Sequence, residues 1–239
     1  MTYIAVPIKV RNIDQALADI QRAEDQKPDL LELRLDYMPD LDEKVIDILL
    51  ECCDLPVIAT IRHGSESGPD PEAGFKGLEG QSDEEREKYR ASLFKHLIVR
   101  GAAYVDIEAS KYDAVRSYML GEGETKINKK NTRFIISNHD FERTPENLVG
   151  LCTSFRYNIR EADIIKLAVQ ANSEEDCKRI IHLLDHSDIP LIAIGMGEYG
   201  ANTRIHPGNF ITYAALEKGK GTAKGQFTVA ELRELLPEE

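Results

Sequence analysis

A lysine inside an apolar segment is the strongest chemical signal in this sequence of 239 residues. Lys166 lies in the run DIIKLAV, and lysine is rarely buried without a specific cause. Burial, together with cations such as Arg34 and Arg62, is expected to lower the pKa of its amine, and the neutral amine is the form that attacks a carbonyl carbon. We therefore predict that Lys166 forms an imine with a carbonyl substrate. A lysine that reaches solvent from an edge strand is the alternative.

His139 is the second candidate, at the end of the apolar run RFIISNHD. The ordinary pKa of histidine lies near neutrality, which suits general acid–base catalysis. His139 ends the apolar run that precedes the run of Lys166, and the two residues fall on the same inferred face, so their side chains are predicted to converge. A hydrogen-bonded core histidine with no catalytic role is the alternative.

Eight short apolar runs rich in β-branched residues predict eight strands: YIAVPI, LLELRLD, PVIATIR, AYVDIEA, RFIISNHD, DIIKLAV, PLIAIGM and NFITYAAL. Helical periodicity lies between most of them, over 12–26, 42–53, 82–100, 112–120, 145–160, 173–186 and 228–236. The expected helix starts are Asp14, a Ser82–Glu85 capping box, Pro145 in a first turn, Ser173 and Thr228.

This alternation of strands and helices predicts the α/β class, and within it a (β/α)8 TIM barrel that forms a single domain over residues 1–239. An open doubly wound sheet is the alternative. Such a sheet usually has a glycine-rich turn after its first strand, whereas the first strand here continues into PIKVRN, without glycine.

Alternation along the strands predicts which side chains point into the barrel. Six strands contribute to this inner face: Glu32 and Arg34, Thr60 and Arg62, Asp106 and Glu108, Ser137 and His139, Ile164 with Lys166 and Ala168, and Ile194 with Met196. A barrel interior is normally apolar, and buried charge is costly unless it is paired. Each residue alone could serve structure, but the group at the strand ends predicts a site for a polar ligand.

Two loops rich in glycine and polar residues, 64–80 and 218–226, are predicted to lie over this site. The second loop contains GKGTAKGQ, which could form a phosphate cradle or a lid. His182 and His186 are spaced for a metal on one helix, but no third ligand is evident, and we predict a structural role. The four cysteines form no CxxC pair, which indicates reduced and mostly buried thiols.

Composition bears on the partners and the location of the protein. The chain has 30 basic and 42 acidic residues, a net charge of −12, which disfavours nucleic acid and anionic membranes as partners. No apolar run reaches the ~18 residues of a membrane-spanning helix. The amino-terminal segment has no signal-peptide pattern, so we expect a cytoplasmic location.

Seven motifs in order resemble type I 3-dehydroquinate dehydratase, the third enzyme of the shikimate pathway: ELRLD, TIR with a following glutamate, DIE, SNHDF with a nearby threonine-proline, DIIKLAV, GMGEYGANTR and TAKGQ. The resemblance implies a lyase that dehydrates 3-dehydroquinate to 3-dehydroshikimate in chorismate and aromatic amino acid biosynthesis. It implies a small-molecule substrate, no metal, no cofactor and a homodimer.

The resemblance also implies residue roles. Lys166 matches the imine-forming lysine, His139 the catalytic histidine and Glu66 the carboxylate paired with it. The substrate-binding positions are Arg204 for the carboxylate, Glu32, Arg34 and Arg62 for the hydroxyls, Met196 near the ring, and Thr222 and Gln226 in the lid. The chain departs from the family pattern with Ser67 after Glu66 and with Lys224 in the lid.

Two other functions remain open from the residues themselves. A Schiff-base aldolase that acts on a sugar phosphate would use the same lysine and would need a phosphate site. A non-catalytic barrel that binds a small anion would need neither Lys166 nor His139.

Overall fold

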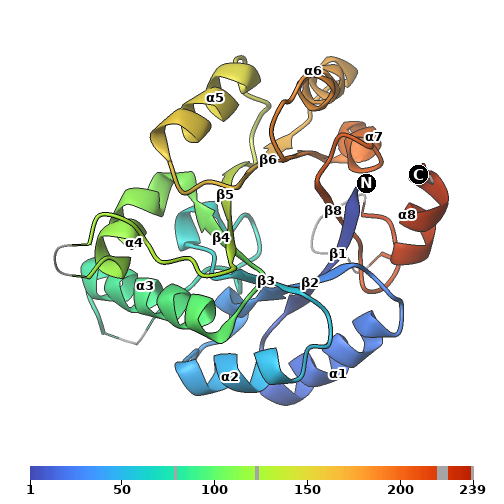
Figure 1. Cartoon of the computed structure of the whole chain (residues 1–239). Coiled ribbons are helices and arrows are strands. Elements are labelled where there is room, and N and C mark those ends of the chain that lie inside the picture. The colour runs from blue at the N-terminus through green and yellow to red at the C-terminus, as the bar shows by residue number, and fades with distance from the viewer. Residues whose placement is uncertain (78–79, 122–123, 220–225, 238–239) are drawn as a thin grey trace.

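The computed structural model describes residues 1–77, 80–121, 124–219 and 226–237. Eight strands alternate with helices around a central barrel, which confirms the predicted fold class (Figure 1). The strands are β1 Tyr3–Lys9, β2 Leu30–Arg34, β3 Val57–Thr60, β4 Tyr104–Glu108, β5 Arg133–Asp140, β6 Ile164–Gln170, β7 Leu191–Met196 and β8 Ile211–Tyr213. The α-helices are α1 Ile13–Glu24, α2 Glu43–Glu51, α3 Asp83–Arg100, α4 Tyr112–Met119, α5 Leu148–Asn158, α6 Glu174–Asp185, α7 Ala201–Arg204 and α8 Val229–Leu235.

The barrel is joined by parallel ladders everywhere except between β7 and β8. The hydrogen-bonded order is β7-β6-β5-β4-β3-β2-β1-β8. At the remaining seam the backbone N–H of Phe210 donates to the carbonyl of Leu191 at 2.8 Å, and the Asn209 side-chain oxygen accepts from Ala193 N at 2.8 Å. An asparagine side chain thus replaces part of the missing ladder.

The interior of the barrel has two chemically different zones along the strands. The first inward residues of the strands are apolar and form one cluster that includes Leu30, Ile58, Ile135, Ile164, Ile192 and Ile211. The next inward residues are polar or charged and are also buried, and they include Glu32, Thr60, Arg62, Asp106, Ser137 and Lys166. The outward residues, such as Ile4, Val6 and Ile8, pack beneath the helices. The charged zone therefore lies towards the carboxyl ends of the strands.

The observed starts of two helices, α1 and α5, differ from the predicted ones. Asn12, not Asp14, caps α1, because its side chain accepts from Gln15 N. The helix expected from Pro145 begins only at Leu148, after the cap Asn147. The capping box of Ser82 and Glu85 and the caps Ser173 and Thr228 are confirmed.

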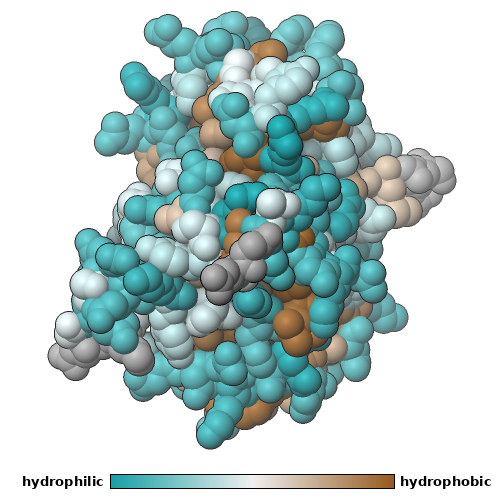
Figure 2. Space-filling view, turned by 60° about the vertical axis from the view of Figure 1, so that its left-hand side comes forward, coloured by the Kyte–Doolittle hydropathy of each residue, from teal (hydrophilic) through white to brown (hydrophobic). Residues whose placement is uncertain are grey.

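The surface is polar. The face shown in Figure 2 is mostly hydrophilic, with apolar residues in separate patches, in keeping with 30% charged residues. Within the described ranges, no helix has the length and apolar character to cross a membrane. All four cysteines are free thiols; Cys152 and Cys177 are buried, Cys53 is half-buried, and Cys52 is exposed, contrary to expectation for that residue.

Candidate active site

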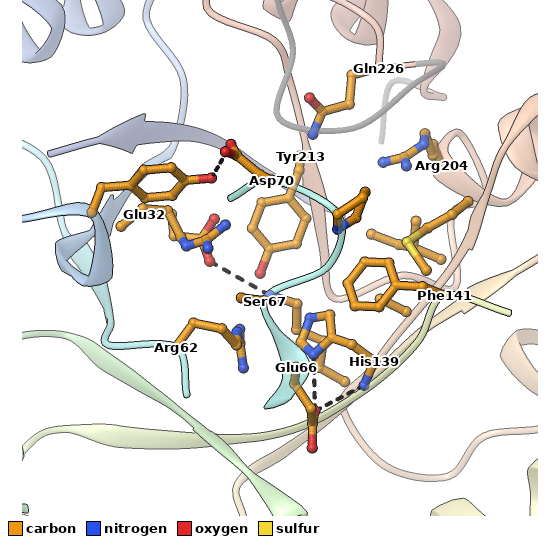
Figure 3. A pocket seen from close by; sticks show the side chains of 17 residues that line it. Glu32, Arg62, Glu66, Ser67, Asp70, His139, Phe141, Arg204, Tyr213 and Gln226 are labelled. Atoms are coloured by element: carbon orange, nitrogen blue, oxygen red, sulfur yellow. Dashed lines mark hydrogen bonds and ion pairs between the residues drawn. The ribbon is translucent and has the colours of Figure 1, made fainter. Parts of the chain in front are cut away.

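A pocket opens at the carboxyl ends of the strands, over the charged zone of the barrel. Nine of the predicted site residues line it: Glu32, Arg34, Arg62, Glu66, His139, Lys166, Met196, Arg204 and Gln226. The tenth, Thr222, lies outside the described residues. Figure 3 shows that these side chains reach the pocket from several different strands and loops. Residues separated by almost 200 positions in sequence therefore share one cavity.

Lys166 lies deep in this pocket with a side chain that is only 7% exposed. Its Nζ donates to the Asp106 Oδ2 at 2.8 Å and lies 3.6 Å from Glu32 Oε1. It also lies 4.5 Å from the centre of the Tyr213 ring. Three groups from three other strands thus surround the amine.

The pKa of Lys166 is raised, so the expectation of a lowered value is wrong. Burial is the largest single influence and lowers it, but Asp106, Tyr213 and Glu32 together outweigh burial and stabilise the ammonium form. The two cations that were expected to repel it themselves lie next to carboxylates, and Arg62 shares Asp106 with Lys166. Arg34 forms a two-pronged pair with Asp36 at 2.8 Å for both contacts, and Arg62 lies 2.9 Å from Asp106.

His139 is held by Glu66. The Glu66 Oε2 lies 3.3 Å from His139 Nδ1 and accepts from the His139 backbone N–H at 3.1 Å (Figure 3). Ser110 donates to the other carboxylate oxygen at 2.6 Å. This arrangement orients the imidazole, and with the ring proton on Nδ1 the other ring nitrogen can accept a proton.

The pKa of His139 lies well below its ordinary value. Burial is the main cause, followed by the charges of Arg62 and Lys166. The pKa of Glu66 is raised, mainly by burial. The histidine is therefore neutral in the resting site and available as a base.

Arg62 belongs to a buried ion-pair network that extends outside the pocket. It donates to Ser137 Oγ at 2.8 Å and to Glu108 at 3.2 Å. Glu108 accepts from Arg90 of α3 at 2.7 Å, and Arg90 and Glu108 are both fully buried. The network ties a pocket cation to an outer helix and so fixes its position.

Arg204 differs from the other cations of the pocket. It is 2% exposed, its Nε has no hydrogen-bond partner, and no carboxylate of the described residues pairs with it. Burial alone lowers its pKa to about 10, so the guanidinium is still charged at neutral pH. A buried, unpaired cation is costly in an empty site and is stabilised when an anion binds.

The local fold of GMGEYGANTR explains how Arg204 reaches the pocket. A Cβ on Gly200 would lie 2.2 Å from the Gly195 carbonyl oxygen, so this close approach requires glycine. Gly195 N in turn donates to Thr203 at 2.8 Å, and Thr212 holds the Arg204 carbonyl at 2.7 Å. These contacts fix the short helix α7 against β7 and β8.

The loop after β3 covers one side of the pocket. Asp70 accepts from Lys9 and from the Tyr37 hydroxyl, each at 2.8 Å. Asp36 accepts from the backbone N–H of Gly74 at 3.1 Å. The contact with Lys9 is the main cause that lowers the pKa of Asp70 to about 2, so this pair is charged at neutral pH.

Three pocket features were missed from the sequence. Asp106 was placed on the inner face but given no role, although it is the closest partner of Lys166. Tyr213 could have been found by extending the alternation through NFITYAAL. Asp70 carries no such signal, because it lies in an irregular loop.

The predicted structural role of His182 and His186 agrees with their contacts. Their rings lie 4.1 Å apart, and His186 Nδ1 donates to the His182 carbonyl at 2.8 Å. Among the described residues, no group of three or more histidine, cysteine, aspartate or glutamate side chains could hold a metal ion.

Comparisons with known proteins agree on one family. The family model for type I 3-dehydroquinase matches residues 4–238. A 3-dehydroquinate dehydratase from Methanococcus maripaludis (strain C7) is 35% identical over 98% of both chains. A crystal structure of the 3-dehydroquinate dehydratase from Aquifex aeolicus VF5 has a TM-score of 0.75 and 29% identity, and covers 98% of this chain and 97% of the other.

Proposed function

The chain belongs to the type I 3-dehydroquinase family and is a hydro-lyase of that family, and from this premise we propose that it dehydrates 3-dehydroquinate to 3-dehydroshikimate through an imine on Lys166. The finer parts of this proposal are the covalent intermediate, the residue roles and a place in chorismate and aromatic amino acid biosynthesis. We further propose a single catalytic domain, a cytoplasmic homodimer, and no nucleic-acid partner.

The buried guanidinium of Arg204, which pairs with no carboxylate of the described residues, is the observation that carries the proposal. It lines the same pocket as Lys166 and His139, so an anionic group is expected next to an amine and a base. 3-Dehydroquinate has the matching groups, namely a carboxylate, a ring ketone and a hydroxyl that can leave. A phosphorylated substrate would need several donors, whereas one guanidinium suits one carboxylate.

The reaction begins with attack on the ketone. The ammonium of Lys166, which contacts Asp106 at 2.8 Å, first loses a proton to solvent. Asp106 stays ionised, because Arg62 and Lys166 outweigh burial and hold its pKa well below the usual range. The neutral amine adds to the ketone carbon, and loss of water then gives an iminium. The positive nitrogen withdraws electrons and acidifies the neighbouring carbon.

His139 then acts twice. Its neutral imidazole removes the proton from the carbon next to the iminium, which gives an enamine. The imidazolium gives that proton to the departing ring hydroxyl, which leaves as water. Hydrolysis of the conjugated imine releases 3-dehydroshikimate and restores Lys166. Glu66 orients His139 and stabilises its charged form.

The remaining residues bind the substrate in this proposal. Arg204 pairs with the carboxylate, and Met196 packs against the ring. Polar groups at the pocket wall hold the ring hydroxyls, and the proposed set is Glu32, Arg34 and Arg62, with Thr222 and Gln226 from the lid. No step requires a metal or an organic cofactor, because the iminium supplies the electron sink.

Trapping with borohydride tests the proposal directly. The protein is mixed with 3-dehydroquinate and sodium borohydride, and peptides are analysed by mass spectrometry. We expect a reduced adduct on Lys166, and an ultraviolet-absorbing enone when borohydride is omitted. Lys166→Met is expected to give neither, whereas Lys178→Met, on the exposed face of α6, is expected to behave as wild type.

If neither adduct nor enone forms with the wild-type protein, the dehydratase function is wrong. An adduct formed only with phosphorylated carbonyl compounds would favour an aldolase. Tight binding of carboxylates without adduct or turnover would favour a non-catalytic anion-binding barrel.

A further inference from the structure

Tyr213 of β8 has a buried hydroxyl group without a hydrogen-bond partner. The residue is 5% exposed, and no hydrogen bond of normal length and angle joins the hydroxyl to a described residue, although Lys166 lies close enough to offset part of the rise in pKa that burial causes. Leaving such a hydroxyl unpaired costs free energy, so buried hydroxyls are normally paired. The position of this hydroxyl therefore requires an explanation.

The two ends of the Tyr213 side chain lie in different environments. Its ring belongs to the apolar zone of the barrel interior, together with Ile194 and Ile211. The same residue also lines the active-site pocket, and Figure 3 shows its hydroxyl pointing in among the other lining side chains. The ring thus packs in the apolar zone beneath the active-site pocket, while the hydroxyl points into the pocket, where a bound ligand can contact it.

The hydroxyl lies beside the amine that attacks the substrate. Lys166 Nζ is 4.5 Å from the centre of the Tyr213 ring. Burial raises the pKa of Tyr213, and its phenol is therefore protonated at neutral pH and can donate a hydrogen bond.

Attack on a ketone creates a specific electrostatic problem at this place. The ketone oxygen gains negative charge as Nζ bonds to its carbon, and this oxygen must lie close to Nζ. The carboxylates of Asp106 and Glu32 border the same space, and an ionised carboxylate can only accept. The developing negative charge therefore needs a donor that opposes their field.

The other hydroxyls near the amine are already engaged. Thr60 donates to Glu32 at 3.0 Å, and Ser137 donates to Asp106 at 2.6 Å. Among the described hydroxyls next to these two carboxylates, the one on Tyr213 remains unused.

We propose that Tyr213 is a further catalytic residue, whose hydroxyl donates a hydrogen bond to the ketone oxygen while Lys166 attacks and to the same oxygen in the carbinolamine. This inference rests on the proposed function and assigns a group to its first step.

The proton balance of that step is complete without a proton from Tyr213. The Lys166 ammonium releases one proton to solvent, and the amine lone pair forms the N–C bond as the C=O pair moves to oxygen. One N–H proton then passes to that oxygen, which gives the neutral carbinolamine. One proton taken up from solvent reaches the hydroxyl, the C–O bond breaks, and water leaves as the nitrogen lone pair forms the iminium. Tyr213 stabilises charge on the oxygen throughout and stays protonated.

Tyr213→Phe isolates the hydroxyl, since the ring and its contact with Lys166 are kept. We expect the single-turnover rate of borohydride trapping at saturating 3-dehydroquinate to fall about 100-fold, the effect of removing one donor to a developing oxyanion. The control is Tyr112→Phe, which removes a buried phenol hydroxyl from α4 outside the pocket and is expected to leave the rate unchanged. Substitution of 3-fluorotyrosine at 213 keeps a donor and is expected to restore trapping.

Three results would overturn this assignment. The first is a trapping rate in Tyr213→Phe equal to that of wild type. The second is a rate that differs only through a shifted pH midpoint with the same plateau, because the hydroxyl would then act on Lys166 and not on the substrate oxygen. The third is a rate that 3-fluorotyrosine does not restore in a protein that melts like wild type. Failure of the wild-type protein to form any adduct would instead remove the proposed function itself.

Discussion

The Nζ of Lys166 lies 2.8 Å from Oδ2 of Asp106, and both side chains are buried. The nucleophile is therefore stored as an ammonium ion in the resting site and not as a free amine. The rate of imine formation is expected to rise with pH, because only the deprotonated amine attacks. The contact with Asp106 also predicts how replacing this aspartate changes the pKa of Lys166.

Asp106→Asn is expected to move the pH midpoint of borohydride trapping to lower pH. Asp106 stabilises the charged form of Lys166, and its removal lowers the amine pKa by about one to two units, the equivalent of one charge-assisted hydrogen bond. A midpoint that stays at the wild-type pH would contradict this account, and Asp113→Asn on α4 serves as the control.

His139→Asn is expected to separate imine formation from elimination. Turnover should fall about 10²- to 10⁴-fold, which is the range for loss of a general acid–base group. The adduct on Lys166 should still form, because His139 acts after the iminium in the proposed mechanism. Mass spectrometry of the borohydride-treated variant measures this, and a variant that forms no adduct would assign His139 to the earlier step.

The pH dependence of kcat/KM should also report His139. Burial and two nearby cations lower the pKa of His139 well below 6.5, so the base form persists into acidic solution. The acidic limb of the profile is therefore expected well below the ordinary histidine value of about 6.5. An acidic limb centred at the ordinary value would show that His139 is not held in this environment in the free enzyme.

Arg204→Met is expected to weaken substrate binding and to stabilise the free protein at the same time. Loss of a buried ion pair with the substrate carboxylate should raise KM about 100-fold, from roughly 3 kcal/mol. Removal of an unpaired buried cation should raise Tm by about 2 to 6 °C for a protein of this size. Differential scanning calorimetry and steady-state kinetics test both effects. A lower Tm would mean that Arg204 already has a stabilising partner.

Glu108→Gln is expected to destabilise the fold by up to about 3–5 kcal/mol, because the buried Arg90 then keeps Glu87 as its one carboxylate partner among the described residues. The pKa of Glu108 is lowered, since Arg90 and Arg62 together outweigh burial. Its stabilising contribution is therefore present at neutral pH and is lost as pH falls through the folded-state pKa. The difference in unfolding free energy from wild type should shrink in acid. Lys88→Ala, in an exposed pair, is the control and should leave Tm unchanged.

The strands and their inward faces could be predicted because alternation is a local property. The same alternation brought Lys166 and His139 to one face, and the register of Ser137 opposite Lys166 on neighbouring strands agrees with it. Helix limits depended on capping choices between close neighbours, which explains why Asn12 was missed in favour of Asp14.

The electrostatics of the site could not be predicted from local sequence. The sign of the Lys166 shift depends on Asp106, which is 60 residues away, and on the carboxylates that neutralise Arg34 and Arg62. Arg204 came only from the resemblance, since a helix of four residues has no periodicity to read. The roles of the lid residues Thr222 and Gln226 stay predictions.

The seam between β7 and β8 determines which part of the barrel is expected to open first. Neighbouring strands elsewhere share ladders, but this seam is held by one backbone hydrogen bond and by the Asn209 side chain. Among the eight strands, amide hydrogen exchange is expected to be fastest in β7 and β8, because separating these two strands breaks the fewest hydrogen bonds. The segment that crosses the seam also carries Arg204. Substrate bound to Arg204 is therefore expected to stabilise the closure of the barrel between β7 and β8, where neighbouring strands share the fewest hydrogen bonds.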